Sequence, residues 1–349
     1  MKNKSQSGGD YSNNYQAETI NKFGLSYTDV KAIANELIEK NFQKLSKIAH
    51  EQAISRIQEI VKDVIEEIKK QDGLNTDKFA DPDIQSSLFS IQVSYAKSGS
   101  PNLKNWLINS FVRLLKTEKE SLEEIVLKEC LNIFSKITEV QLNILSLKYQ
   151  IDYIQRNNLK TYEDLKEFIK DELIPLLEKI RNKSTSITHL IYLGCINENG
   201  GIRSGLGFIG DIYEIYNGGL TEFFDSNSLK ISETSKLLLD KFCTKYEDDI
   251  YKFNVLNRKD LRNKLIYLPI EQDLIEEVLD LYSEYTMSQP RFRQMIDKDI
   301  PELKELEDRY RIIDTGNYHL TTIGLALAEI YLNSQGYTHI SLMGKFLEE

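Results

Sequence analysis

The sequence predicts a mainly α-helical protein with an N-terminal long-helix bundle, a Gly-rich junction and a C-terminal winged-helix-like α+β domain. Three observations carry this prediction. Residues 25–72 contain no glycine or proline, and their apolar residues recur at steps of three and four. Eight of the 17 glycines fall within residues 194–219. Near the C-terminus, two alternating segments flank the turn-forming residues 314–317.

The first long helix has a defined start. Ser26 with Asp29 three residues later matches a capping box, and Gln71-Asp72-Gly73 marks the end. At 1.5 Å per residue a continuous helix of this length would span roughly 65–70 Å, more than one small domain is thick. Its apolar stripe therefore predicts burial either within a long bundle of one chain or in a seam between copies.

Shorter helices follow. Asp81-Pro82 predicts a helix start, Thr138 with Gln141 and Thr161 with Asp164 predict capping boxes, and Pro175 predicts a kink or an end. The composition changes after Ser184, where glycines cluster and the helical spacing of apolar residues is interrupted. Helical spacing returns later in the chain. The predicted parts are residues 1–24, 25–183, 184–230 and 231–349.

Residues 1–24 form either a loose polar tail or a β-forming assembly segment. Residues 5–16 contain no aliphatic side chain and cannot build a core. Short uncharged runs of Asn, Gln, Ser and Tyr are also typical of segments that stack between chains. The candidate interaction residues are Gln6, Gly8, Gly9, Asp10, Ser12, Asn14 and Gln16.

A β-hairpin is predicted at Arg309–Thr321, and a helix is predicted to follow it from Thr322. This order is similar to a winged helix, in which Tyr-x-Leu-Thr-x-x-Gly, here Tyr318–Gly324, leads into the last helix. Residues 291–314 carry six basic and seven acidic side chains, too balanced for affinity driven by phosphates. The candidate DNA-binding residues are the isolated basic cluster Arg258, Lys259, Arg262 and Lys264.

The sequence contains few motifs that indicate a catalytic, nucleotide or metal site. Gly205, Gly207 and Gly210 match G-x-G-x-x-G, but the dinucleotide motif needs a buried strand directly before it, and residues 196–204 intervene. Cys195 with His189 is a conceivable nucleophile pair without a supporting motif. The four histidines lack metal-ligand spacing, so neither a metal nor a cofactor is expected.

Composition limits the binding partners and the cellular location that can be expected for this protein. The 349 residues carry a formal charge of −10, which disfavours general affinity for nucleic acid or anionic membranes. Three scattered cysteines are no disulfide framework, and no apolar run approaches the length of a membrane span. The N-terminus lacks the apolar core of a signal peptide. We expect a cytoplasmic protein that inserts into no membrane.

The segments that carry a family resemblance are Gln6–Ala17, Gly24–Val30, Asn41–Ser46, Asp81–Gln85, Ala96–Gly99, Leu103, His189–Cys195 and Leu320–Gly324. Together they resemble one bacterial family, known under paired locus-tag names from Legionella and Veillonella. The resemblance covers most of the chain and implies no activity, because the family label describes none. The C-terminal part is also similar to helical proteins linked to abortive infection, which implies an anti-phage setting by analogy.

These observations favour a non-enzymatic assembly, sensor or adaptor protein in anti-phage defence. It would act as a homo-oligomer and bind a phage-derived or operon-encoded protein partner. One alternative is an enzyme or nucleotide-binding protein with its site at the Gly194–Gly219 loop. A further alternative is a DNA-binding regulator that uses the C-terminal winged helix.

Overall fold

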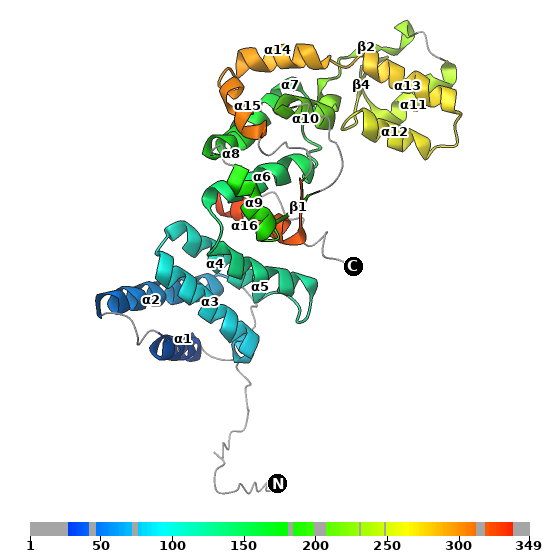
Figure 1. Cartoon of the computed structure of the whole chain (residues 1–349). Helices are drawn as coiled ribbons and strands as arrows, with labels where there is room; N and C mark the ends of the chain where they lie inside the picture. Colours follow the sequence, from blue (N-terminus) through cyan, green and yellow to red (C-terminus); the bar gives the residue numbers. More distant parts are fainter. Residues whose placement is uncertain are drawn as a thin grey trace, which may run out of the picture. The chain divides into compact units, whose positions relative to one another are not determined.

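The computed structural model describes residues 27–41, 47–71, 76–180, 184–198, 207–229, 232–247, 249–311 and 318–337. These residues are mainly helical, with two small antiparallel sheets in the C-terminal part (Figure 1). They form two compact units. Unit 1 holds the described residues up to Ser100 with Phe111–Lys116, and unit 2 holds Pro101–Ser110 and the described residues from Thr117 onward. No described helix is both long and apolar enough to cross a membrane.

Unit 1 is a small helical bundle. Helix α1 packs on both α2 and α3, and α2 packs along α3. The apolar face of α2 is buried in this bundle, including Ile57, Ile60 and Val64. The elements are α1 (Tyr27–Asn41), α2 (Lys47–Lys69), η1 (Thr76–Ala80), α3 (Pro82–Ser98) and the C-terminal part of α4 (Pro101–Leu114).

The prediction of one continuous helix over residues 25–72 is therefore wrong. The chain forms two helices here, α1 and α2, which contact each other. Val30 and Ala34 of α1 are buried, as is the stripe on α2, so neighbouring helices of the same unit cover the apolar faces. The length argument for a seam between copies loses its basis. The predicted cap at Ser26 lies outside the described residues.

Helix α3 begins and ends as predicted. Asp81 caps its N-terminus by accepting a hydrogen bond from the Asp83 N–H, and Pro82 is in the first turn. Gly99 ends the helix with a left-handed φ of +65°. The Arg56 guanidinium donates to the Ala96 carbonyl at 2.8 Å, and a Cβ on Gly99 would lie 2.5 Å from its Cζ. Gly99 therefore makes room for the arginine that caps α3.

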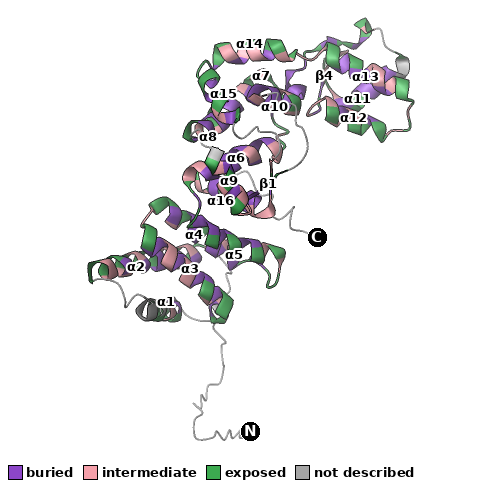
Figure 2. Ribbon diagram, in the orientation of Figure 1, coloured by how far each residue is buried: buried purple, intermediate pink, exposed green. Residues whose placement is uncertain are grey.

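Unit 2 is built around α16. Every residue of this helix from Gly324 to Leu332 is buried, with α5 and α6 packed against it (Figure 2). The elements of this helical body are the N-terminal part of α4, α5 (Leu122–Phe134), α6 (Glu139–Asp152), α7 (Tyr162–Phe168), η2 (Ile169–Leu173), α8 (Ile174–Lys179), α9 (Ser184–Tyr192), β1 (Ile196–Glu198), α10 (Gly207–Tyr216), α14 (Gln289–Asp299), α15 (Leu303–Arg311), β5 (Tyr318–Leu320) and α16 (Thr322–Ser334).

Local signals in the helical body are confirmed. Thr138 and Thr161 head complete capping boxes with Gln141 and Asp164. The chain between α7 and α8 is a π-helical segment, η2, and Pro175 lies in the first turn of α8. Because proline cannot donate the hydrogen bond of a regular α-helix, the helix is interrupted at the point predicted for Pro175.

The predicted hairpin at Arg309–Thr321 is wrong. Arg309–Arg311 complete α15, whose buried residues Leu303, Leu306 and Tyr310 recur at helical spacing. Strand β5 forms, but it pairs antiparallel with β1, with Ile196 opposite Leu320. The described part of the C-terminal region thus lacks the hairpin of a winged helix, because the second strand takes a partner from more than a hundred residues earlier.

Strand β1 and helix α16 meet at a close backbone contact. The Thr321 hydroxyl donates to the Gly194 carbonyl at 2.6 Å, and the Thr321 N–H donates to the Cys195 carbonyl at 3.0 Å. The same hydroxyl caps α16 by accepting from the Gly324 N–H. A Cβ on Gly324 would lie 2.0 Å from the Cys195 carbonyl oxygen. Only glycine fits there, and the segments Gly194-Cys195 and Thr321–Gly324 form one junction.

Residues 217–286 form a subdomain inserted between α10 and α14, here called the insert (Figure 1). Its two connections lie side by side, because Thr221 pairs with Thr286 and the Glu222 N–H donates to the Tyr285 carbonyl at 2.7 Å. The elements of the insert are η3 (Asn217–Leu220), β2 (Phe224–Asp225), η4 (Ser226–Ser228), α11 (Glu233–Phe242), β3 (Cys243–Glu247), β4 (Ile250–Phe253), α12 (Arg258–Ile266) and α13 (Gln272–Glu284).

We predict that Gly324→Ala lowers the free energy of unfolding by more than about 3 kcal/mol, since the new methyl group would overlap a backbone oxygen that cannot move without displacing α16. Urea unfolding followed by circular dichroism measures this. Gly194→Ala is the matched control. Gly194 has a φ of +70° but open space around its Cβ position, so the control should lose only about 1–2 kcal/mol. Equal losses would contradict the steric argument.

Candidate interaction surface

The insert has its own hydrophobic core. The sheet order is β2-β4-β3, all antiparallel, and helices α11, α12 and α13 contribute to the cluster behind the sheet. Phe224 and Phe253 belong to this cluster, with ring centroids 5.4 Å apart. Because successive residues of a strand face opposite sides, the neighbours of these two residues lie on the outer side of the sheet.

A carboxylate joins α13 to the start of α11. Glu277 accepts hydrogen bonds from the Ser232 N–H at 2.8 Å, the Ser232 hydroxyl at 2.9 Å, and the Ser235 hydroxyl. Ser232 is the N-cap of α11. These donors, the Ser235 hydroxyl first, hold the pKa of Glu277 below its usual value of 4.5. A negative charge at a helix N-terminus is favourable, so the contact holds two helices of the insert together.

The outer side of the sheet carries an exposed aromatic pair. Phe223 and Tyr246 meet edge to face with ring centroids 4.8 Å apart, and they are 56% and 58% exposed. The Lys252 Nζ lies 5.6 Å from the Phe223 ring centroid and donates to the Lys160 carbonyl at 2.8 Å. Burial lowers the pKa of Lys252. The outer face therefore combines exposed rings with a lysine held in place.

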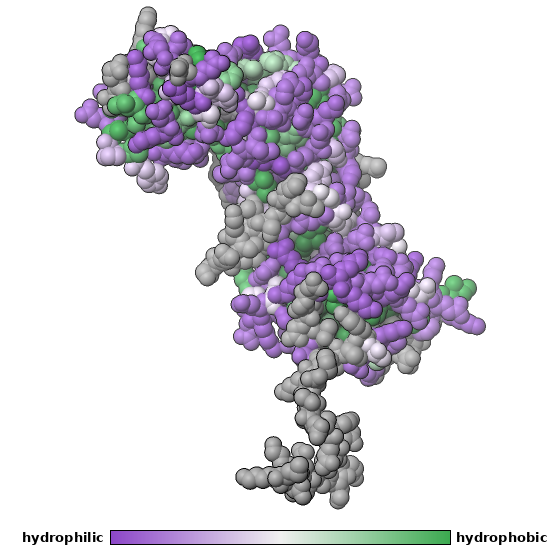
Figure 3. Space-filling view, turned by 180° about the vertical axis from the view of Figure 1, so that it is seen from behind, coloured by the Kyte–Doolittle hydropathy of each residue, from purple (hydrophilic) through white to green (hydrophobic). Residues whose placement is uncertain are grey.

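Exposed apolar side chains gather on the insert. Figure 3 shows one face of the molecule, which is mostly hydrophilic with small, separate hydrophobic areas. Among the described residues, nine large apolar side chains are exposed, and five of them belong to the insert. Of the five, Phe223 and Tyr246 are in contact with each other, which makes this ring pair the candidate interaction site. The five are Phe223, Leu237, Tyr246, Ile266 and Tyr267.

A protein-family model matches residues 24–343, nearly the whole chain. The chain belongs to that family. The description of the family names no activity. No curated protein and no solved structure matches the chain. The matched range includes the residues that form the helical body, the junction at Gly324 and the insert.

The residues of the predicted N-terminal site, and one of the three predicted glycines, lie outside the residues that the structure describes. Gln6, Gly8, Gly9, Asp10, Ser12, Asn14 and Gln16 are beyond the described residues, and so is Gly205. Gly207 and Gly210 lie in the first turns of α10. The strand before them, β1, belongs to a two-stranded antiparallel sheet rather than the parallel sheet of a dinucleotide fold. Nucleotide binding stays a prediction.

The predicted basic cluster lies on α12, where acidic and polar neighbours engage it. Arg262 pairs with Glu276 at 3.1 Å, and Lys264 pairs with Asp260 at 2.8 Å. The Arg258 side chain donates to the Ser283 hydroxyl at 3.1 Å. Lys259 is exposed on the same helix. Such pairing reduces the local field that would attract phosphate, and DNA binding by these residues stays a prediction.

Cys195 and His189 do not form a nucleophile pair in this arrangement. The Cys195 thiol is fully buried below the junction and faces the Leu193 carbonyl at 3.9 Å. Burial raises the pKa of this thiol to about 12. The His189 Nδ1 instead shares a hydrogen bond with the Gln141 amide at 2.9 Å. A thiol that stays protonated at neutral pH is a poor nucleophile, so Cys195 serves packing.

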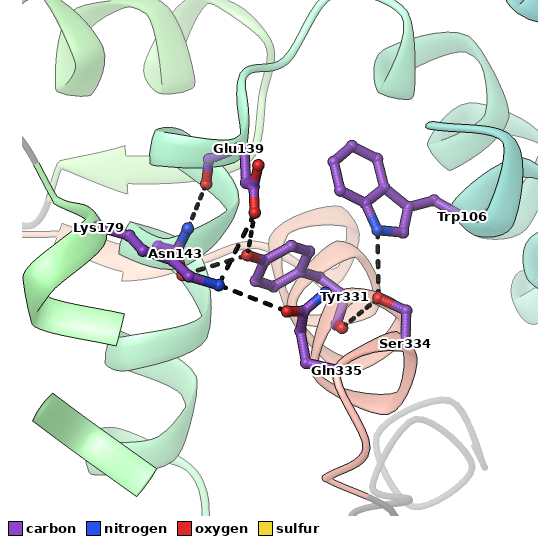
Figure 4. Close-up of polar contacts among 7 residues, drawn as sticks. All are labelled: Trp106, Glu139, Asn143, Lys179, Tyr331, Ser334 and Gln335. Atoms are coloured by element: carbon purple, nitrogen blue, oxygen red, sulfur yellow. Dashed lines mark hydrogen bonds and ion pairs between the residues drawn. The ribbon is translucent and has the colours of Figure 1, made fainter. Parts of the chain in front are cut away.

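A polar cluster in the helical body joins several of its helices (Figure 4). The Tyr331 hydroxyl, from α16, donates to Glu139 at 3.1 Å and lies 3.3 Å from the Asn143 side-chain oxygen, both on α6. Lys179 reaches Glu139 at 3.8 Å and donates to Gln335 at 3.4 Å. These contacts join α16 to α6 and to the end of α8. Within the described chain no group of three or more acidic, histidine or cysteine side chains could hold a metal ion.

Sequence reasoning missed the aromatic pair. Phe223 precedes the buried Phe224, and Tyr246 precedes Glu247 at the end of a strand that the sequence analysis did not identify. The alternation of apolar and polar side chains in Tyr251-Lys252-Phe253 is a sequence signal that could have indicated a strand with one buried side here.

We predict that Cys195 in the native protein resists alkylation by iodoacetamide at pH 8, because burial keeps the thiol protonated and out of contact with the reagent. Peptide mass spectrometry of the labelled protein measures the modified fraction. Denaturation in urea should make Cys195 react fully, which serves as the control. Rapid labelling of the folded protein would contradict the buried position.

We predict that Glu277→Gln destabilises the insert by about 1 kcal/mol at pH 7, since the hydrogen bonds to a charged, solvent-screened carboxylate are lost. The pKa is lowered by folding, so this stabilisation is present above pH 4.5 and is lost as the pH falls through the folded value. Thermal unfolding of both proteins from pH 7 to 3 should therefore show the difference shrinking toward the acid end. A constant difference would contradict the assignment.

Proposed function

We propose that this chain is a non-enzymatic assembly or adaptor protein that acts through homo-oligomerisation and partner binding, with the insert as its docking module. The observation that carries the proposal is the contact between the exposed rings of Phe223 and Tyr246 on the outer side of the sheet, in a subdomain with its own core. Exposed rings on an ordered sheet gain free energy when a partner covers them.

The mixed charge around the rings favours a protein partner over nucleic acid. Lys252 contacts Phe223 on the outer side of the sheet, and the acidic Glu222 and Glu247 adjoin Phe223 and Tyr246 in the sequence. A nucleic-acid surface would need an excess of basic side chains. Aromatic rings with balanced charges are the usual composition of a protein interface.

The setting in anti-phage defence forms part of the proposal and is supported only by resemblance. The sequence resembles a family known under locus-tag names from Legionella and Veillonella, and its C-terminal part is similar to abortive-infection proteins. In this setting the partner would be a phage-derived or operon-encoded protein, and the chain would act in the cytoplasm.

The surface for self-association in this proposal lies on the insert and not on the N-terminal helices. The first helices cover one another's apolar faces within unit 1. The insert instead presents apolar rings and a sheet edge to solvent. The polar contacts described for the helical body join its own helices, whereas the exposed ring pair lies on the insert.

We predict a solution mass above the 40.5 kDa of one chain in light scattering after size exclusion, at concentrations of tens of micromolar. The double variant Phe223→Ser, Tyr246→Ser should weaken self-association about tenfold or more, because it removes the exposed rings. The matched control is Tyr192→Ser, which removes a ring 83% exposed outside the insert and should leave the mass unchanged. A strictly monomeric wild type would remove homo-oligomerisation from the proposal.

A further inference from the structure

The outer side of the insert's sheet, here called the outer face, has an acidic end. Asp225 of β2 and Glu247 of β3 lie opposite Ile250, one on each side of β4. Successive residues of a strand face opposite sides, and Tyr251 packs against the buried cluster, so Ile250 and its two neighbours face outward. Both acidic side chains are exposed. The Asp225 carboxylate accepts from the Asn227 N–H at 2.8 Å, a neutral donor that leaves its negative charge in place.

The other end of the outer face is cationic. Lys252 lies two residues after Ile250 on β4 and faces the same side. Its ammonium group donates to the Lys160 carbonyl at 2.8 Å, and the Lys160 ammonium group donates to the Asn254 side-chain oxygen at 2.5 Å. Both acceptors are neutral. The carboxylate of Asp164, which caps α7, offsets part of the charge of Lys252, and among the described residues this end keeps an excess of positive charge.

The exposed rings of Phe223 and Tyr246 lie between the two ends. The Lys252 Nζ is 5.6 Å from the centroid of the Phe223 ring, so Phe223 adjoins the cationic end. Tyr246 directly precedes Glu247 on β3 and adjoins the acidic end. The two rings meet edge to face with centroids 4.8 Å apart. Along β4, the outer face therefore runs from carboxylates through apolar rings to ammonium groups.

A face with this order of charges is complementary to a second copy of itself. A two-fold axis that runs between two such faces, across their strands, places the acidic end of each copy opposite the cationic end of the other. The rings of both copies then meet in the middle. An axis along the strands would instead bring like ends together, and their repulsion opposes that arrangement. The charge pattern therefore selects one two-fold arrangement.

The same pattern disfavours partners that carry charges of one sign. A nucleic-acid strand or an acidic peptide would be attracted by Lys160 and Lys252 but repelled by Asp225 and Glu247. A basic peptide would meet the opposite conflict. A second copy satisfies both ends at once, because it presents both signs in the required order.

We propose that two copies of this chain associate face to face through the outer faces of their inserts, with Glu247 of each copy opposite Lys160 of the other. Phe223 and Tyr246 lie at the centre of this contact. The inference rests on the proposed function and names the surface and the arrangement of its self-association. Face-to-face packing of two sheets uses side-chain contacts, so it covers the rings and leaves the backbone hydrogen bonds of the insert unchanged.

Charge reversals in the full-length protein test the arrangement. Glu247→Lys and Lys160→Glu each replace the two attractive contacts of the dimer by two repulsive ones. We expect the dissociation constant of either variant, measured by analytical ultracentrifugation, to rise about tenfold or more. The matched controls Asp280→Lys and Lys259→Glu change exposed residues of α13 and α12 by the same charge and should leave the dissociation constant unchanged.

Mixing the two variants shows whether positions 247 and 160 face each other between copies. In a mixed dimer the two introduced charges, of opposite sign, lie opposite each other, and the native Glu247–Lys160 contact is kept. An equimolar mixture should therefore dimerise about as tightly as wild type. If wild type self-associates but the single variants match their controls, or the mixture stays as dissociated as its components, the face-to-face arrangement is overturned and the proposed self-association stands. A monomeric wild type overturns both.

Discussion

The contact between Gly324 and the Cys195 carbonyl sets the arrangement of unit 2. Helix α16 is the core of that unit, and its first turn can approach β1 only because position 324 has no side chain. Thr321 then bonds to both Gly194 and Cys195 while it caps the helix. The contact joins the last helix of the body to a segment more than a hundred residues earlier. Helices α5 and α6 can pack around α16 because this contact fixes where the helix begins.

Local features were predictable because they depend on neighbouring residues. The caps at Asp81, Thr138 and Thr161 and the interruption at Pro175 follow from hydrogen bonds within one or two turns, so spacing alone revealed them. The absence of glycine and proline over residues 25–72 indicated helix correctly, but helical periodicity cannot show whether a helix continues or turns back. The apolar stripes of α1 and α2 are equally compatible with either arrangement.

Long-range pairing accounts for what the sequence could not predict. The alternation of polar and apolar residues predicted strand β5. Its partner is β1, and no local sequence pattern can identify a strand partner that lies so far away in the chain. Likewise, nothing in the sequence distinguishes Phe223 and Tyr246 from other strand residues. Their exposure depends on the helices of the insert covering only the other side of the sheet. A site made of exposed side chains depends on which faces the fold covers, whereas a catalytic motif can be recognised from residue types and spacing alone.

The side-by-side connections of the insert have a consequence for how this protein could vary. Thr221 and Thr286 are paired, so the chain leaves and re-enters the helical body at nearly one point. A short loop could bridge that point with little entropic cost, and α10 would still lead into α14. Lengthening, shortening or exchanging the segment in between would leave the packing around α16 undisturbed. The helical body could therefore stay constant while the insert differs in length or sequence among natural variants.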